Sequence, residues 1–183
     1  MPRIAPIDRA HADADVKAIL SAVKAKIGIV PNLFSTFAQS PAVLNGYLAL
    51  SDALGKGVLT AAQRDIVALA VAQANECSYC LSAHTLMGKG AGLSQEGIRK
   101  ARQGKGETAI DDAIASFARR VVDARGQVSD ADLAVVRSAG LGEAHVIEII
   151  ANVAINVLTN YTNNVALTDI DFPKVDVALR SAA

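Results

Sequence analysis

The sequence predicts an all-α protein of about eight helices, on three observations. Apolar residues recur at intervals of three and four along most of the chain, which is the spacing of one helix face. No segment alternates apolar and polar residues as a half-buried strand does. Capping residues, prolines and glycines divide the chain into segments of helical length. The hydrophobic share of 51% is high, so we also expect a homo-oligomer that buries part of this surface.

The first third of the chain is punctuated by proline and glycine. Residues 1–11 form an irregular lead-in, because prolines interrupt regular pairing. Gly28 ends the first helix, and Ser40 with Pro41 supplies a cap and a first-turn proline for the third. We therefore expect helices over 13–27, 31–37 and 41–54.

The rest of the chain opens with its most apolar helix. Thr60 and Gln63 form a capping-box pattern at its start, and it is apolar nearly all round, which indicates a central position. A final stretch, 168–183, is expected to be a docking arm of the same single domain, 1–183. The helices expected in this part are 60–75, 77–89, 94–103, 111–125, 129–139 and 143–167.

Composition excludes several functions. Lys and Arg number 18 and Asp and Glu number 18, so no basic excess favours nucleic acid or an anionic membrane as partner. No apolar run approaches the ~20 residues of a membrane-spanning helix. The N-terminus lacks the apolar core of a secretory signal, so we expect a cytoplasmic protein.

The two cysteines of the chain lie in one short motif, Cys77-Ser78-Tyr79-Cys80, with His84 four residues further on. On a helix, residues 77, 80 and 84 share one face, which gathers two thiols and an imidazole within two turns. Three interpretations compete: a dithiol redox site, a metal site, or two small buried residues beside an incidental histidine. In the cytoplasm, a lone cysteine pair is more often catalytic or metal-binding than structural.

This motif has the parts that thiol chemistry requires. The predicted helix begins at or just after Cys77, and a helix N-terminus stabilises a thiolate. His84 can take the proton of Cys80 one turn away, and the second thiol can resolve an oxidised sulfur as a disulfide. Asp65, on the preceding helix, would reach the height of His84 if the chain folds back near residue 75. It could instead be a solvated acid in the first turn of its own helix.

The motif resembles the core of the AhpD-like, carboxymuconolactone decarboxylase superfamily, in which an acidic residue precedes C-x-x-C-x-x-x-H by eleven residues. Here Asp65 precedes Cys77, Cys80 and His84 at that spacing. The resemblance extends to the peroxidase-related branch of the superfamily. Its C-terminal signature is similar to TNYxNxVAxTxIDFP at 159–173, and PNLF at 31–34 also fits.

The resemblance implies a compact all-α oligomer that reduces hydroperoxides by cycling a CxxC dithiol, without a bound metal or organic cofactor. Cys80 would attack the peroxide, Cys77 would resolve it, and His84 with Asp65 would relay protons. The relay acid is usually Glu, so Asp65 is one methylene shorter and would need a bridging water or a changed geometry. Tyr79 is a candidate hydrogen-bond donor. Tyrosine at this place also resembles the sestrins, where the first cysteine is reactive, so the order of attack stays open.

Partners and alternatives complete the prediction. The expected partners are a hydroperoxide and an unidentified thiol reductant, for example a lipoyl- or thioredoxin-type donor. Two other functions remain open: lactone decarboxylation on the same fold, and a non-catalytic redox-sensing or scaffold oligomer. A zinc ion held by the two thiols, His84 and Asp65 is a further alternative.

One polar feature of the last predicted helix also has two interpretations. Four asparagines recur there at steps of four, which predicts either a polar seam in the oligomer core or part of a pocket over the thiols. They are Asn152, Asn156, Asn160 and Asn164.

Overall fold

The structure, a computed structural model, describes residues 1–179 of the 183. This part of the chain contains helices and no strands, as the sequence predicts. Nine helices are present within it, one at each of the ranges expected from the sequence, although the number expected was about eight. They are α1 (Ala14–Ile27), α2 (Asn32–Phe37), α3 (Pro41–Leu54), α4 (Ala61–Ala74), α5 (Ser78–Gly90), α6 (Gln95–Arg102), α7 (Ala109–Asp123), α8 (Asp130–Ser138) and α9 (Glu143–Ala166).

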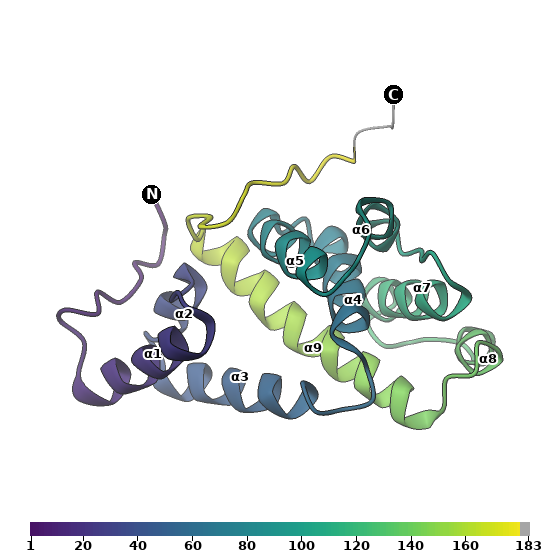
Figure 1. Cartoon of the computed structure of the whole chain (residues 1–183), viewed down its shortest axis with the longest axis horizontal. Coiled ribbons are helices and arrows are strands. Elements are labelled where there is room, and N and C mark those ends of the chain that lie inside the picture. Colours follow the sequence, from purple (N-terminus) through teal and green to yellow (C-terminus); the bar gives the residue numbers. More distant parts are fainter. Residues whose placement is uncertain (180–183) are drawn as a thin grey trace.

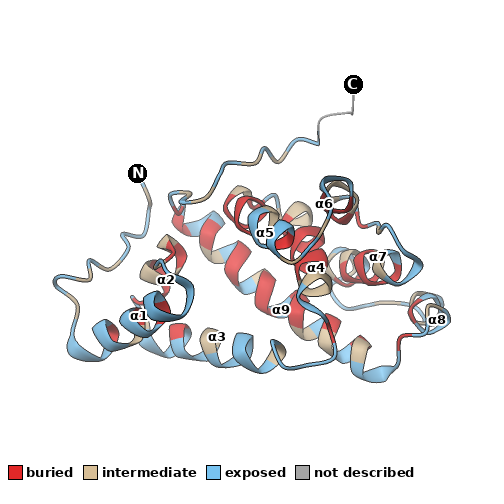
Figure 2. Cartoon of the chain, in the orientation of Figure 1, coloured by how far each residue is buried: buried red, intermediate tan, exposed pale blue. Residues whose placement is uncertain are grey.

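Helix α4 lies at the centre of the protein, where its apolar sequence places it. It packs against α5, α6, α7 and α9. Every residue from Asp65 to Ala72 is buried, so the helix has no solvated face over two turns. In Figure 2, red segments of α4, α5, α7 and α9 gather in the middle of the molecule. Burying apolar residues on all sides stabilises the helix by packing rather than by propensity.

The 24-residue helix α9 runs diagonally across the molecule between α3 and the α4–α5 pair (Figure 1). Its inner side is buried and polar as well as apolar. Its outer side leaves large apolar side chains in solvent, namely Ile147, Ile150, Leu158, Tyr161 and Val165. These residues are compatible with the expected homo-oligomer, which stays a prediction.

Helix ends follow the capping chemistry of the sequence. Thr60 and Gln63 form the expected reciprocal capping box at the start of α4. Gly28 ends α1 with φ 84°, a left-handed conformation that glycine adopts without a Cβ penalty. Helix α7 begins at Ala109, two residues before its expected start, because the Thr108 hydroxyl accepts the Asp111 N–H and caps it.

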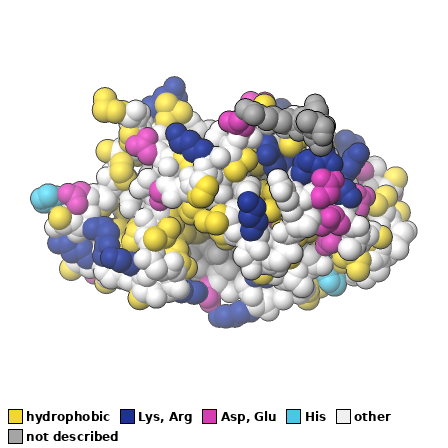
Figure 3. Space-filling view, turned by 45° about the horizontal axis from the view of Figure 1, so that its top comes forward, with side chains coloured by type: hydrophobic (Ala, Val, Ile, Leu, Met, Phe, Trp, Pro, Cys, Tyr) yellow, Lys and Arg dark blue, Asp and Glu magenta, His cyan; other side chains and the backbone are white. Residues whose placement is uncertain are grey.

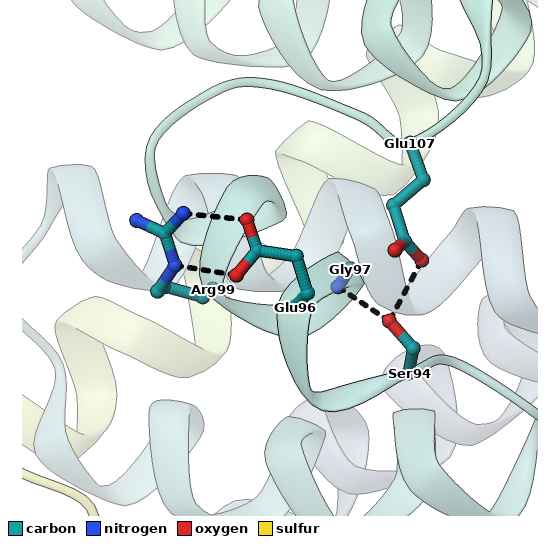
Figure 4. A network of polar contacts seen from close by, with 5 residues as sticks. All are labelled: Ser94, Glu96, Gly97, Arg99 and Glu107. Atoms are coloured by element: carbon teal, nitrogen blue, oxygen red, sulfur yellow. Dashed lines mark hydrogen bonds and ion pairs between the residues drawn. The ribbon is translucent and has the colours of Figure 1, made fainter. Parts of the chain in front are cut away.

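The start of α6 is held by the network of side chains in Figure 4. Ser94 Oγ accepts the Gly97 N–H at 2.8 Å and donates to Glu107 Oε2 at 2.8 Å. Arg99 Nε donates to Glu96 Oε2 at 2.7 Å, and its Nη2 donates to the other carboxylate oxygen. A Cβ at Gly97 would stand 2.6 Å from Glu107 Oε2, so this glycine leaves room for the carboxylate. These contacts connect the start of α6 to Glu107, in the loop that follows α6.

The described part of the C-terminal arm, 168–179, crosses α4, α5 and α6. The Val175 N–H donates to Ser82 Oγ at 3.0 Å, and Gln73 Nε2 donates to the Val177 carbonyl at 3.0 Å. Arg102 Nη2 donates to the carbonyls of Asp176 and Val177 at 2.6 and 3.1 Å. The expected docking arm is thus visible up to residue 179, and residues 180–183 lie outside the described part.

The surface shows charges of both signs. In Figure 3, Lys and Arg side chains stand beside Asp and Glu on the face shown, without one continuous patch of a single sign. Within residues 1–179, no single helix is long and apolar enough to span a membrane. Helices α8 and α9 satisfy that test only when taken together, and they are bent by 115°.

Glu148 of α9 fixes the loop that leads into α4. Its carboxylate accepts the N–H groups of Val58 and Leu59 at 2.8–3.1 Å. Because hydrogen bonds to a charged group are worth more than neutral ones, Glu148→Ala is expected to lower the free energy of unfolding by about 1–3 kcal/mol. Urea unfolding measures this. Glu143→Ala, which removes an exposed ion pair with Arg137, is the control and should cost at most about 1 kcal/mol. Equal losses in both variants would contradict the prediction.

Candidate active site

A tight turn joins α4 to α5 and places the first cysteine. Asn75 ends α4, and Glu76 follows in the left-handed conformation at φ 51°. The Cys77 N–H then donates back to the Ala72 carbonyl at 2.9 Å, the long-range bond of a Schellman motif. The chain therefore reverses within three residues, and Cys77 becomes the N-cap of α5.

The two thiols meet at this helix N-terminus. Cys77 Sγ accepts the Cys80 N–H at 3.3 Å, and the two sulfurs lie 2.7 Å apart without a disulfide. Cys77 is 0% exposed and Cys80 is 3% exposed. The expected helix start is confirmed, since Ser78 is the first helical residue. The sulfurs are close enough for a disulfide to form with a small movement of either side chain.

His84 meets Asp65 across the α4–α5 pair. The distance from His84 Nδ1 to Asp65 Oδ1 is 2.8 Å, so the shorter acid reaches the imidazole directly and needs no bridging water. The Asp65 side chain is 9% exposed and the His84 side chain 20% exposed. Gly88, one turn after His84, lies beside Asp65, and a Cβ there would stand 3.0 Å from Leu93 Cδ1 and in ordinary contact with Asp65 Cβ at 3.6 Å. Asp65 is therefore not a solvated first-turn acid.

The pKa values of the two thiols are shifted in opposite directions. Burial raises the pKa of Cys80, but the Cys77 thiol, the charge of His84 and the amides of Asn163 and Asn160 outweigh it, and the pKa is lowered overall. The hydrogen bond to Cys80 raises the pKa of Cys77, and burial and the nearby Cys80 charge raise it further. Cys80 is thus the group that ionises first, with Cys77 as its protonated donor.

Asp65 favours the protonated form of the imidazole beside Cys80. Burial alone would lower the pKa of His84, but the hydrogen bond and charge of Asp65, together with the charge of Cys80, raise it overall. Asp65, His84 and Cys80 thus lie in a row, and these shifts favour an imidazolium beside a thiolate. Such a row allows a proton to move between the imidazole and a group bound at the sulfur.

The inner face of α9 closes the site with asparagines. Asn163 Nδ2 donates to Cys80 Sγ at 3.3 Å, and Asn160 is fully buried beside it. Asn152 and Asn156 are buried as well, within the single chain rather than in an oligomer core. The pocket interpretation of the asparagines is therefore favoured for these residues.

One of the four asparagines lies outside this site. Asn164 is exposed, and its Nδ2 donates to the Asn75 carbonyl at 2.8 Å. Asn163, which the spacing of four did not include, lies beside the sulfur instead. A spacing of three from Asn160 is as compatible with one helix face as a spacing of four, so the sequence alone did not distinguish Asn163 from Asn164.

Tyr79 does not join the row of charged groups. Its hydroxyl accepts the Leu33 N–H at 3.2 Å, and its ring meets Phe172 edge-on at 5.5 Å between centroids. Burial raises the pKa of Tyr79, the Leu33 N–H opposes this, and the Asp171 carboxylate raises it further, so the phenol stays protonated. Tyr79 thus connects the CxxC motif to α2 and to the arm, and it forms no hydrogen bond with either sulfur.

The residues do not surround a metal position. Within residues 1–179, no three side chains of His, Cys, Asp or Glu converge as metal ligands. Asp65 faces the Nδ1 atom of His84 and not the sulfurs. This geometry does not favour the zinc alternative, in which all four groups would bind one ion.

A cavity of about 170 Å³ leads to the imidazole end of the site. Both Asp65 and His84 lie on its wall, and Cys80 does not, so the cavity stops short of the sulfur. Burial raises the pKa of Tyr47 to about 12, with the Cys80 charge adding to it, so this wall residue stays a neutral donor. The cavity is lined by Tyr47, Ser51, Leu54, Ala61, Arg64, Asp65, His84, Met87, Asn152, Ile155, Asn156 and Thr159.

Comparison with known proteins shows which proteins share this fold. Residues 41–124, which include α3 to α7 and the whole CxxC motif, match the carboxymuconolactone decarboxylase family. An uncharacterized peroxidase-related protein of the alkylhydroperoxidase AhpD core type, from Ralstonia eutropha JMP134, is 26% identical with a TM-score of 0.83. The match covers 93% of this chain and 92% of that one.

Two further solved structures share the fold. A peroxidase-related protein from Silicibacter sp. TM1040 is 22% identical with a TM-score of 0.78, over 91% of this chain and 92% of that one. The debrominase Bmp8, solved with 2,3,4-tribromopyrrole, is 17% identical with a TM-score of 0.76, over 92% of this chain and 91% of that one. No curated protein matches the sequence.

These matches support the predicted family. Residues 41–124 match the carboxymuconolactone decarboxylase family, and the fold of nearly the whole chain is similar to that of the AhpD core and of peroxidase-related proteins. The superfamily fold also supports debromination in Bmp8, so the fold alone does not assign the reaction.

The charge of His84 is expected to set the pH at which Cys80 reacts. In a Cys77→Ser background, alkylation of Cys80 by iodoacetamide should reach half its maximum below the free-thiol value of about 8.5. Adding His84→Ala removes the nearest cation, so the midpoint should move to higher pH. The rate of alkylation against pH measures both. Identical midpoints with and without His84 would contradict the assignment.

Proposed function

We propose that the chain is a thiol-dependent peroxidase that reduces hydroperoxides through a Cys77–Cys80 dithiol. The observation that supports this most directly is the order of groups from Asp65 through His84 to Cys80, with the Cys77 sulfur 2.7 Å beyond. These groups supply, in sequence, an orienting acid, a proton donor, a nucleophile and a resolving thiol. Thiol-dependent reduction of an O–O bond requires these four groups.

The first step oxidises Cys80. The Cys80 thiolate attacks the terminal oxygen of the hydroperoxide, a sulfur–oxygen bond forms, and the O–O bond breaks. The leaving alkoxide takes the proton of His84 and departs as an alcohol. Because Asp65 holds the protonated imidazole in place, the donor needs little reorganisation during the reaction.

The second step forms the Cys77–Cys80 disulfide, which a reductant then cleaves. The Cys77 thiol attacks the sulfur of the Cys80 sulfenic acid, the S–S bond forms, and the oxygen leaves as water with the Cys77 proton. A cytoplasmic dithiol, for example of lipoyl or thioredoxin type, then returns two electrons to the disulfide. Both cysteines are almost fully buried, so the disulfide has to become exposed before this reductant can reach it.

The pKa values favour Cys80 over Cys77 as the attacking thiol. The pKa of Cys80 is lowered and that of Cys77 is raised, and only a thiolate is an effective nucleophile. Cys80 is also the cysteine next to the charge of His84. We therefore retain the order implied by the AhpD proteins rather than that of the sestrins.

The two cysteines should respond differently to replacement by serine. Cys80→Ser is expected to abolish hydrogen peroxide consumption, because it removes the nucleophile. Cys77→Ser is expected to react once and stop, because the sulfenic acid then has no resolving thiol. Stopped-flow peroxide consumption and mass spectrometry of the product measure this, with a Cys77–Cys80 disulfide expected in the unsubstituted protein.

Other outcomes would favour the remaining functions. Full turnover of a lactone or halogenated substrate by the Cys77→Ser/Cys80→Ser protein would contradict the proposal, because that chemistry needs no dithiol. Stoichiometric oxidation without turnover, under both monothiol and dithiol reductants, would indicate a redox sensor. Retention of both thiols after exposure to peroxide would exclude both thiol-based functions.

A further inference from the structure

Two asparagines of α9 have unused hydrogen-bonding groups beside the reactive sulfur. Within residues 1–179, Asn160 Nδ2 has no acceptor and Asn163 Oδ1 has no donor, although both atoms are buried. Asn160 is 0% exposed and Asn163 is 4% exposed. Buried polar groups are nearly always paired, so two such groups at one sulfur call for a specific partner.

The orientation of Asn160 is fixed from the opposite side. Asn75 Nδ2, at the α4–α5 turn, donates to Asn160 Oδ1 at 3.0 Å. The oxygen of the Asn160 amide therefore faces the turn, and its NH₂ group is the free end. Asn164 also binds the turn, through the Asn75 carbonyl, so α9 holds the turn at two points.

The free ends of the two amides lie at Cys80. Asn163 Nδ2 donates to the Cys80 sulfur at 3.3 Å, so the Asn163 amide lies at that sulfur and its Oδ1 atom is the end left unpaired. The amides of Asn163 and Asn160 are both among the groups that lower the pKa of Cys80 against the effect of burial. One unused donor and one unused acceptor thus flank the atom that is oxidised.

A sulfenic acid has the matching groups. Its oxygen accepts a hydrogen bond and its O–H donates one, whereas the reduced sulfur is a weak partner for either. We propose that Asn160 and Asn163 bind the oxygen that Cys80 acquires on oxidation, with Asn160 Nδ2 donating to this oxygen and Asn163 Oδ1 accepting its hydrogen. This inference rests on the proposed peroxidase function and adds a binding site for its intermediate.

The site acts on both steps of the reaction. As the sulfur–oxygen bond forms, negative charge moves to the departing alkoxide, and the Asn160 N–H donates to the oxygen that is transferred to sulfur and so orients the peroxide. When Cys77 attacks, the same N–H stabilises the oxygen that leaves with its electron pair and takes the Cys77 proton to become water. Between the two steps, the pair of hydrogen bonds holds the intermediate in place.

The test replaces the free donor while keeping the contact to the turn. In a Cys77→Ser background, where the sulfenic acid persists, Asn160→Asp retains an oxygen for Asn75 but presents an acceptor to Cys80. We expect the second-order rate constant with hydrogen peroxide to fall by about tenfold or more. We also expect the alkylation midpoint of Cys80 to move to higher pH, and a dimedone-type probe to detect a shorter-lived sulfenic acid.

Asn164→Asp in the same background is the matched control. It changes the other asparagine that holds the turn, at an exposed position without contact to the sulfur, and should leave the rate constant within about twofold. Equal rates in both variants and the parent would overturn the proposal. Equal losses in both, with equally lowered unfolding temperatures, would show that Asn160 only holds the turn.

A second variant provides an independent test in case Asn160→Asp impairs folding. Asn163→Leu removes the other amide without touching the Asn75 contact, and it should also shorten the lifetime of the sulfenic acid. An unchanged lifetime in this variant would overturn the role of Asn163. If the Cys77→Ser parent gains no oxygen from peroxide, the proposed peroxidase function itself fails, and this inference fails with it.

Discussion

The hydrogen bond between Asp65 and His84 joins α4 to α5 at the height of the reactive thiol, and the site depends on it. It requires the three-residue reversal at residue 75, which brings two helices of the chain into an antiparallel pair. It also keeps a positive charge beside Cys80, in a place where burial alone would favour neutral groups.

Three parts of the chain surround the Asp65–His84 pair and the two cysteines. Helices α4 and α5 supply the charged row and the two sulfurs, and α9 covers them with amides that cannot titrate. The arm and α2 hold the CxxC motif from the other side through Tyr79 and Ser82. The Cys80 sulfur is therefore nearly fully buried, and it accepts hydrogen bonds from the Cys77 thiol and from the Asn163 amide.

Most of the fold and the centre of the site were predictable from local patterns. Caps such as Thr60 with Gln63 act within one helical turn, so the sequence contains the whole interaction. The CxxC-x-x-x-H spacing and the distance to Asp65 depend on one helix and one short turn. The choice between Asn163 and Asn164 was not predictable, because it depends on how α9 is rotated against α5. The contacts of Tyr79 with Leu33 and Phe172 were likewise not predictable, because these residues lie far from Tyr79 in the sequence.

The central claim is that Asp65 keeps His84 protonated next to Cys80, and a titration of His84 by NMR in wild type and in Asp65→Asn tests it most directly. Asparagine retains an acceptor of similar shape but has no charge. The account predicts that the pKa of His84 falls in the variant, because an opposite charge at hydrogen-bonding distance is lost. A His84 pKa that is unchanged in the variant would contradict the account.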